Sequence, residues 1–166
     1  MPAEVISRLI NGLNDSDAAV RSESAQALAG LGESARGAAV PLVRACGDGD
    51  ESVREWAVAA LEDLGPPAAD DAQALAQLAA DRNSDVAYWA ITLLGRLEEQ
   101  AAAAVPNLEA ALAGSEAAAV RQRAAWALGK IGKKAAAALE ALKAAADDND
   151  PRLARLAQSA IEKIRG

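Results

Sequence analysis

The stretch Val120–Gly132, which decides the fold, reads Val-Arg-Gln-Arg-Ala-Ala-Trp-Ala-Leu-Gly-Lys-Ile-Gly. Its apolar residues recur at helical spacing, and Gly132 follows where the C-cap of a helix belongs. The positions that fall on one face are Val120, Ala124, Ala127, Leu128 and Ile131. The stretch therefore predicts one amphipathic helix with a defined end.

Similar helices recur along the chain at a nearly constant period. Copies of the motif start at Val20, Val53, Val86, Val120 and Leu153, so successive starts lie 33 or 34 residues apart. A second, weaker apolar pattern precedes each copy, which indicates two helices per unit. Such a period is typical of a stacked repeat array. We predict one domain over residues 1–166, with repeats at approximately 1–32, 33–65, 66–98, 99–132 and 133–166.

The links before the motif helices are rich in capping residues. Asp150 is expected as an N-cap, with Pro151 as the first helical residue. The segment Asp81-x-Asn83-x-Asp85 copies the first three ligands of a calcium loop, but Val and Thr stand where Gly and Glu are required, so we interpret it as a helix cap. In the third repeat Glu98 replaces the closing glycine, and we expect the turn after it to be helical or frayed.

The composition excludes several classes of function. The chain has no His, so Ser-His-Asp catalysis, Cys-His catalysis and His-rich metal sites are impossible. We expect no enzymatic activity, no catalytic residue, no metal and no cofactor. The formal net charge is −7, which argues against nucleic acid as a partner. No apolar run reaches the roughly 18 residues that span a bilayer, and the single Cys46 implies no disulfide; we expect a cytoplasmic monomer.

The repeated pattern Asp-x-Asp-x-x-Val-Arg-x-x-Ala-x-x-Ala-Leu-x-x-Leu-Gly resembles the HEAT-like repeats of bilin lyases and related bacterial proteins. It is clearest in Asp48–Gly65 and Val120–Gly132. The resemblance implies an all-α, armadillo-like fold, a right-handed α-α superhelix or solenoid of about five helical hairpins. It also implies that the second helix of each hairpin lines a concave face used for binding, although a fold does not by itself carry a function.

The resemblance further implies a ladder of arginines that join successive links through their aspartates. Arg21, Arg54 and Arg121 match the arginine of the family pattern, whereas Ala87 and Ala154 depart from it. The ladder is therefore expected to be broken at the third and fifth repeats. We interpret these arginines as structural.

The polar side of the second helices carries the candidate binding residues. If positions 0, +4, +7, +8 and +11 after each motif start face inward, then +2, +3, +6 and +10 face outward. All three Trp and the only Tyr of the chain fall on these outward positions, and the same surface is acidic in the early repeats and basic in the late ones. The candidates are Trp56, Tyr88, Trp89, Arg96, Arg123, Trp126 and Lys130.

Three hypotheses on function follow. The first is a non-enzymatic scaffold that binds a protein or peptide through the concave face, because Trp, Tyr and Arg are enriched at binding hot spots. The second is a bilin-lyase-like helper that handles a chromophore. The third is a structural or artificial repeat scaffold without a ligand. The aromatic rings also admit an interpretation as packing between alanine-rich helices.

Overall fold

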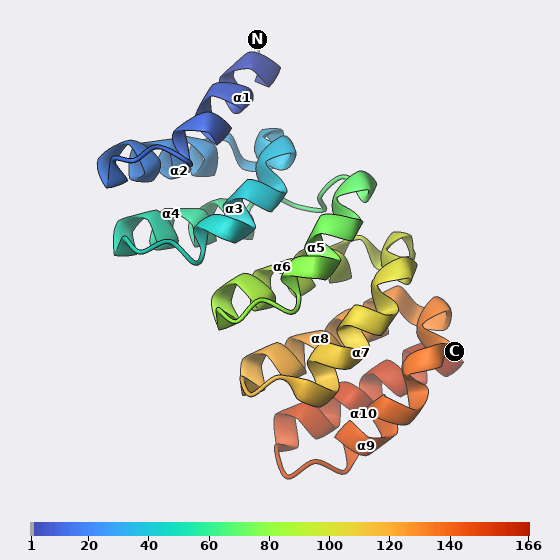
Figure 1. Cartoon of the computed structure of the whole chain (residues 1–166). Coiled ribbons are helices and arrows are strands. Elements are labelled where there is room, and N and C mark those ends of the chain that lie inside the picture. The colour runs from blue at the N-terminus through green and yellow to red at the C-terminus, as the bar shows by residue number, and fades with distance from the viewer. Residues whose placement is uncertain (1) are drawn as a thin grey trace. The chain divides into compact units, whose positions relative to one another are not determined.

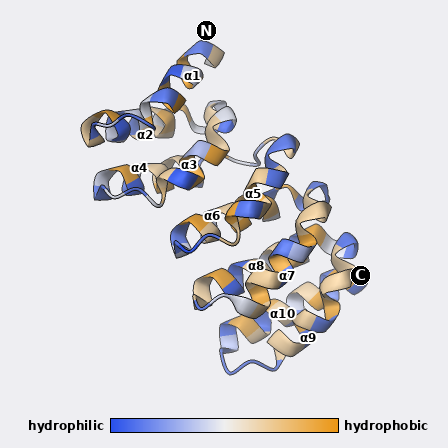
Figure 2. Ribbon diagram, in the orientation of Figure 1, coloured by the Kyte–Doolittle hydropathy of each residue, from blue (hydrophilic) through white to orange (hydrophobic). Residues whose placement is uncertain are grey.

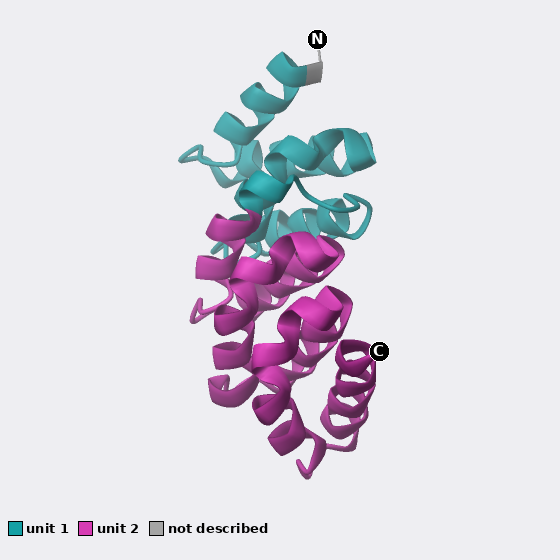
Figure 3. Cartoon of the chain, turned by 90° about the vertical axis from the view of Figure 1, so that its right-hand side faces the viewer, with its two compact units in different colours: residues 1–71 teal, residues 72–166 magenta. Residues whose placement is uncertain are grey.

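The computed structural model describes residues 2–166, and all regular elements in this part of the chain are helices. They form a succession of helical hairpins, which confirms the all-α fold class and the solenoid organisation (Figure 1). The chain forms two compact units, residues 1–71 and 72–166, which are described separately (Figure 3).

Unit 1 contains two hairpins, α1–α2 and α3–α4. Its elements are α1 (Pro2–Gly12), α2 (Ala18–Leu31), the 3-10 helix η1 (Gly32–Ala38), α3 (Ala39–Ala45), α4 (Glu51–Glu62) and η2 (Ala69–Asp71). The second helices, α2 and α4, pack directly on each other, and each also contacts the first helix of its own hairpin.

Unit 2 contains three hairpins. Its elements are α5 (Ala72–Leu78), α6 (Ser84–Arg96), η3 (Glu98–Ala104), α7 (Val105–Gly114), α8 (Ala118–Ile131), η4 (Gly132–Ala138), α9 (Leu139–Ala146) and α10 (Pro151–Arg165). The second helix α8 packs against both α6 and α10, while α7 contacts α5 and α9. The unit therefore has a layer of first helices and a layer of second helices.

The links begin the second helices in the way that their side chains predict. Asp17, Asp50, Asn83 and Asp150 each accept a hydrogen bond from a backbone N–H in the first turn of the following helix. The helix-cap interpretations of Asn83 and Asp150 are thereby confirmed. Hydrophilic residues gather at the links before α2, α4 and α10 (Figure 2). The exception is α8, whose N-cap Ala117 has no side chain that can cap.

The second helices of three hairpins are followed by glycines with positive φ, as the C-cap pattern predicts. Gly32, Gly65 and Gly132 have φ angles of 51°, 73° and 71°. Glu98 has a φ of 52° at the equivalent position, although it carries a side chain. The segment that follows is the 3-10 helix η3, so the prediction of a helical turn there is confirmed.

The core is built from the predicted inward positions. Leu28, Leu61, Leu94 and Leu128, all at position +8, are fully buried. Two expectations were wrong. Thr92, expected on the outer face, is buried, and its hydroxyl donates to the carbonyl of Tyr88, so the side chain needs no solvent. Val20, Ala27 and Leu31, expected inside, are exposed, Val20 and Leu31 by 37% and 36%. Their spacing of seven and four residues places them on one stripe of α2, which its neighbours leave uncovered.

Candidate functional site

Five candidate side chains from α6 and α8 form one contiguous group, which we call the aromatic–arginine cluster. Its members are Tyr88, Trp89, Arg96, Arg123 and Trp126, and each is partly exposed. The Tyr88 and Trp89 rings meet edge to face, with centroids 5.7 Å apart and planes at 84°. This arrangement is one of the favoured geometries for aromatic pairs.

Arg123 joins the two helices at the centre of the cluster. Its guanidinium carbon lies 4.5 Å from the centroid of Tyr88 and 4.9 Å from that of Trp126. Its Nη2 also donates a hydrogen bond to the Tyr88 hydroxyl. A cation over an aromatic face is attracted by the ring quadrupole, so two rings and one hydrogen bond hold this side chain in place.

Helical spacing explains how these residues come together. Trp89 and Arg96 are seven residues apart on α6, which returns the chain to the same face after two turns. The guanidinium carbon of Arg96 lies 5.9 Å from the centroid of the Trp89 ring. Arg123 and Trp126 are three residues apart on α8, which packs beside α6. The cluster is therefore a product of two outward faces and one helix-helix contact.

A glycine that the sequence analysis did not single out makes room for the cluster. A Cβ atom built on Gly95 would lie 2.3 Å from Cζ3 of Trp126, so the indole ring rests against the backbone of α6. The signal available in the sequence was a glycine inside a helical pattern, which usually marks a close approach. One side of the Trp126 ring therefore packs against α6, while Trp126 as a whole remains partly exposed to solvent.

The other two candidates lie apart from the cluster. The Nζ atom of Lys130 is 3.3 Å from Oε1 of Glu98, in a solvent-exposed ion pair. Trp56 belongs to α4 in unit 1, where it is partly exposed. The structure thus brings together five of the seven predicted binding residues.

Basic residues lie near the cluster on α8 and on its neighbour α10. The helix α8 carries Arg121, Arg123 and Lys130 and no acidic residue. On α10, the neighbouring second helix, Arg155 and Lys163 are both exposed. The outward positions of α8 and α10 that the sequence analysis describes as basic therefore all lie within unit 2, with Lys130 paired to Glu98.

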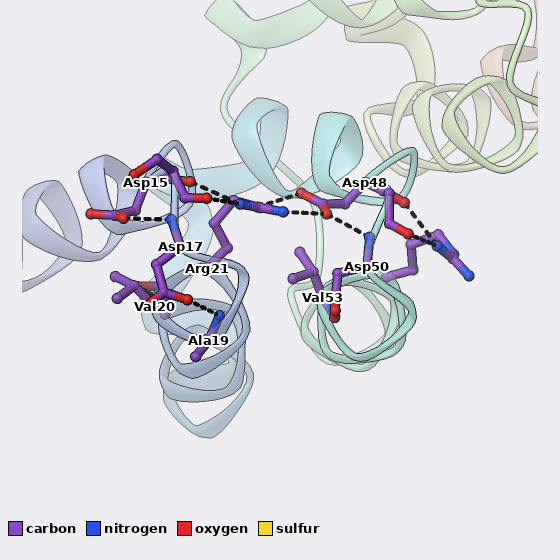
Figure 4. Close-up of polar contacts among 12 residues, drawn as sticks. Asp15, Asp17, Ala19, Val20, Arg21, Asp48, Asp50 and Val53 are labelled. Carbon is purple, nitrogen blue, oxygen red and sulfur yellow. Dashed lines mark hydrogen bonds and ion pairs between the residues drawn. The ribbon is translucent and has the colours of Figure 1, made fainter.

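The predicted arginine ladder is present in unit 1 (Figure 4). Nε and Nη2 of Arg21 donate to the two carboxylate oxygens of Asp48, at 2.8 and 3.0 Å. Nη1 of Arg21 donates to the backbone carbonyls of Asp15 and Ser16 in its own link. The hydrogen bonds from Arg21 lower the pKa of Asp48 below its ordinary value, against an opposing effect of burial. This confirms the structural interpretation of Arg21.

The ladder is weaker at Arg121 and missing where alanine replaces arginine. Nη1 of Arg121 lies 3.9 Å from Oδ2 of Asp148, and its buried Nε has no hydrogen-bond partner among the described residues. Gln122 supplements this contact by donating to Oδ2 of Asp150 at 2.7 Å, which lowers the pKa of that carboxyl group. Ala87 has no side chain that can take part, so the predicted break at the third repeat is confirmed.

Residues 2–166 contain neither a cluster suited to a metal ion nor a helix suited to a membrane. No group of three or more His, Cys, Asp or Glu side chains in this part of the chain is placed to hold a metal ion. None of its helices is both long and apolar enough to cross a membrane.

The solved structures that are similar to this chain include an engineered protein and designed armadillo repeat proteins. An engineered protein from a structural genomics consortium matches with a TM-score of 0.67 and 22% identity, over 96% of this chain and 78% of its own. A designed armadillo repeat protein matches with a TM-score of 0.64 and 21% identity, over 98% and 83%. Another designed armadillo repeat protein, solved in complex with a (KR)4 peptide, matches with a TM-score of 0.68 and 22% identity, over 98% of this chain and 82% of its own.

The family comparison covers most of the chain. A search of curated proteins gives no match. The family profile described as HEAT repeats matches twice, over residues 6–83 and 72–162. With its repeated helical hairpins and the arginine ladder of unit 1, the chain belongs to the HEAT-repeat family.

Proposed function

We propose that this HEAT-repeat scaffold is a non-enzymatic binding protein and that the aromatic–arginine cluster holds a protein or peptide segment. The observation that carries the proposal is the cluster itself. Three of the four aromatic residues of the chain lie in it, interleaved with two arginines on adjoining outer faces. Trp, Tyr and Arg dominate the binding energy of protein interfaces.

The geometry of the cluster favours binding at low entropic cost. Arg123 is held by the rings of Tyr88 and Trp126 and by the Tyr88 hydroxyl. Trp126 is restrained by the backbone at Gly95. Side chains that are ordered before binding lose little conformational freedom on binding, which makes a cluster of this kind a suitable anchor.

The charge of the surface points to the chemistry of the partner. Arg96 and Arg123 belong to the cluster, and Lys130, Arg155 and Lys163 lie on α8 and α10. A segment with Asp or Glu beside an apolar side chain complements this face, and its approach is accelerated by electrostatic attraction. The net charge of −7 disfavours nucleic acid, which binds through neutralisation of its phosphates.

One solved structure of this fold supports the class of function. One designed armadillo repeat protein of this fold is in complex with a peptide. At 22% identity that likeness concerns the fold, so the residues that would bind here are argued from the cluster alone. Trp56 provides a separate contact within unit 1, because it lies three residues after the motif valine of α4, as Trp89 does in α6.

The test is capture on an array of peptides in which each acidic peptide is paired with its Asn/Gln counterpart. Wild-type protein is expected to retain the acidic peptides preferentially. The double variant Arg123→Gln with Trp126→Ala is expected to lose at least tenfold in affinity, because it removes the central cation and its ring. Arg152→Gln, an exposed charge on α10 outside the cluster, is the matched control and is expected to bind as wild type does.

A triple variant of Trp56, Trp89 and Trp126 to Ala completes the experiment. If this variant is folded by circular dichroism and captures the same peptides as wild type, the proposal is wrong. If wild type shows no preference for the acidic member of each pair, the assignment of the partner's charge is wrong.

A further inference from the structure

A cavity of about 830 Å³ lies in unit 2 on the link side of the hairpins, and no residue of the aromatic–arginine cluster lines it. Its walls come from the link before α6 and from α7 with the link before α8. The lining includes Asp81, Arg82 and Ala87 on one side and Gly114, Ser115 and Glu116 on the other. Most of these residues are exposed, so the cavity opens to solvent.

The cavity occupies the position where unit 1 has an arginine side chain. Arg21, directly after the motif valine of α2, fills the space between its own link and the next (Figure 4). Ala87 is the equivalent residue of α6, and it supplies only a methyl group. Ser115 stands where the next link would present the carboxylate that Asp48 presents to Arg21. Both partners of the ladder contact are thus absent at this one place.

The backbone that receives a guanidinium elsewhere is preserved at the cavity. Arg21 donates to the carbonyls of Asp15 and Ser16, and Arg54 donates to those of Asp48 and Gly49 at 2.9 and 3.1 Å. The equivalent carbonyls here belong to Asp81 and Arg82.

The three links share the same turn. In each link an aspartate carboxylate accepts a hydrogen bond from the backbone N–H of the residue two positions later. The aspartates are Asp15, Asp48 and Asp81, and the distances are 2.8, 2.9 and 2.8 Å. The residue before each second helix is extended in all three. The two carbonyls therefore lie where their counterparts accept from arginine, while Ala87 provides no donor.

The charge of the lining suits a cation. Asp81 and Glu116 contribute two carboxylates, and Arg82 contributes one positive charge. The hydroxyl of Ser115 adds an acceptor, since an O–H group has two lone pairs and only one is used by the N–H of Ala117 at 3.3 Å. Carbonyls, a hydroxyl and carboxylates match a planar group with five N–H donors better than they match an ammonium.

We propose that this cavity is a binding site for a guanidinium group, supplied by an arginine side chain of a partner protein or peptide. The partner's arginine takes the place that Arg21 and Arg54 occupy in the first two hairpins. The site lies on the links and is independent of the aromatic–arginine cluster, so either can exist without the other.

The test uses three small probes, the N-acetyl amides of arginine, lysine and citrulline, followed by NMR chemical shifts of the backbone amides. The arginine probe is expected to shift the amides of residues 81–83 and 115–117 at millimolar concentration. The lysine and citrulline probes are expected to shift them less, because one lacks the planar fork and the other lacks the charge. Residues 15–17 provide an internal control, since Arg21 already fills their site.

Two variants separate the site from general attraction to acidic residues. Ala87→Arg fills the cavity from within and is expected to abolish the shifts, whereas Ala154→Arg places the same residue at the equivalent position of α10 and leaves them intact. Ser115→Asp restores the missing carboxylate and is expected to tighten binding of the arginine probe roughly tenfold, as for a hydrogen bond to a charged group.

Three outcomes would overturn the proposal. One is the absence of shifts at both links with the arginine probe. The second is equal shifts with the lysine probe, and the third is shifts that persist in a folded Ala87→Arg variant. Because Ser115→Asp predicts a gain in affinity, a loss of folding in Ala87→Arg would still leave the proposal open to refutation.

Discussion

The helix pair α2–α4 in unit 1 and the helix pair α6–α8 in unit 2 each have an apolar core of the same kind. The two pairs differ at their links and at their outer faces. Leu28 and Leu94, at the same position of the motif, are fully buried. At the link edge, α2 and α4 are joined by Arg21 and Asp48, whereas α6 and α8 leave a cavity. At the outer face, α6 and α8 carry the aromatic–arginine cluster.

This comparison separates what stacks the hairpins from what distinguishes them. Apolar burial along the inward face is common to both pairs and supplies most of the stability of such helices. The link edge and the outer face are partly exposed, so substitutions there cost little and new interactions can arise. Candidate binding groups of unit 2 lie at these two edges.

The largest expected effects come from the shared core. Leu28→Ala and Leu94→Ala each remove a fully buried side chain, and each is expected to lower the free energy of unfolding by roughly 2–5 kcal/mol. Urea unfolding followed by circular dichroism measures both. A much smaller loss for Leu28→Ala, whose hairpin has the arginine contact, would show that the contact rather than the core holds the pair.

A glycine pair tests the packing at the outer face of α6. Gly95→Ala places a methyl group against Trp126 and is expected to destabilise by about 1–3 kcal/mol through overpacking. Gly30→Ala is the control in α2, because nothing lies within 4 Å of the added atom. There the better helix propensity of alanine is expected to stabilise by up to about 1 kcal/mol. Equal gains in thermal unfolding would mean that Trp126 does not rest on Gly95.

The Arg21–Asp48 contact is tested by Asp48→Asn, which keeps the turn but removes the charge. The loss is expected to be about 1 kcal/mol at neutral pH, above that of an ordinary surface pair because the contact is bidentate. Since folding lowers the pKa of Asp48, this stability is present above the ordinary value near 4 and is lost as the pH falls through the lowered pKa. A difference between wild type and variant that persisted unchanged in strong acid would contradict this cause.

The uncapped start of α8 predicts a gain. Ala117→Asp supplies the N-cap side chain that α2 and α4 already have, and it is expected to stabilise by about 1 kcal/mol. The reverse change in unit 1, Asp17→Ala, is expected to cost a similar amount. Thermal unfolding of both variants would contradict the comparison if the two changes had the same sign.

The smallest expected effect concerns the end of α6. Glu98 has a positive φ, as Gly32 has after α2. The change Glu98→Gly is expected to relieve this unfavourable conformation and to stabilise the protein by somewhat less than about 1 kcal/mol, because the variant also loses the exposed ion pair with Lys130. Glu98→Ala loses the pair but keeps the unfavourable backbone conformation, so it is the control. A gain in both variants would show that the side chain, not the backbone, was the source of strain.

The sequence by itself determined the repeat and its helices. Burial of the motif leucines, the caps at Asn83 and Asp150 and the break at Ala87 could all be predicted, because helix periodicity and capping depend on residues close in the chain. The burial of Thr92 could not be predicted in this way, because its hydroxyl donates to a backbone carbonyl of its own helix and needs no hydrogen bond to water.

Only the tertiary structure decided which outward residues meet. Three features depend on how closely α6 and α8 approach. They are the contact of Arg123 with Tyr88, 35 residues away in the chain, the packing of Trp126 against Gly95, and the cavity at Ala87. That distance is set by the packing of side chains from both helices, and a periodic pattern along one helix does not contain it.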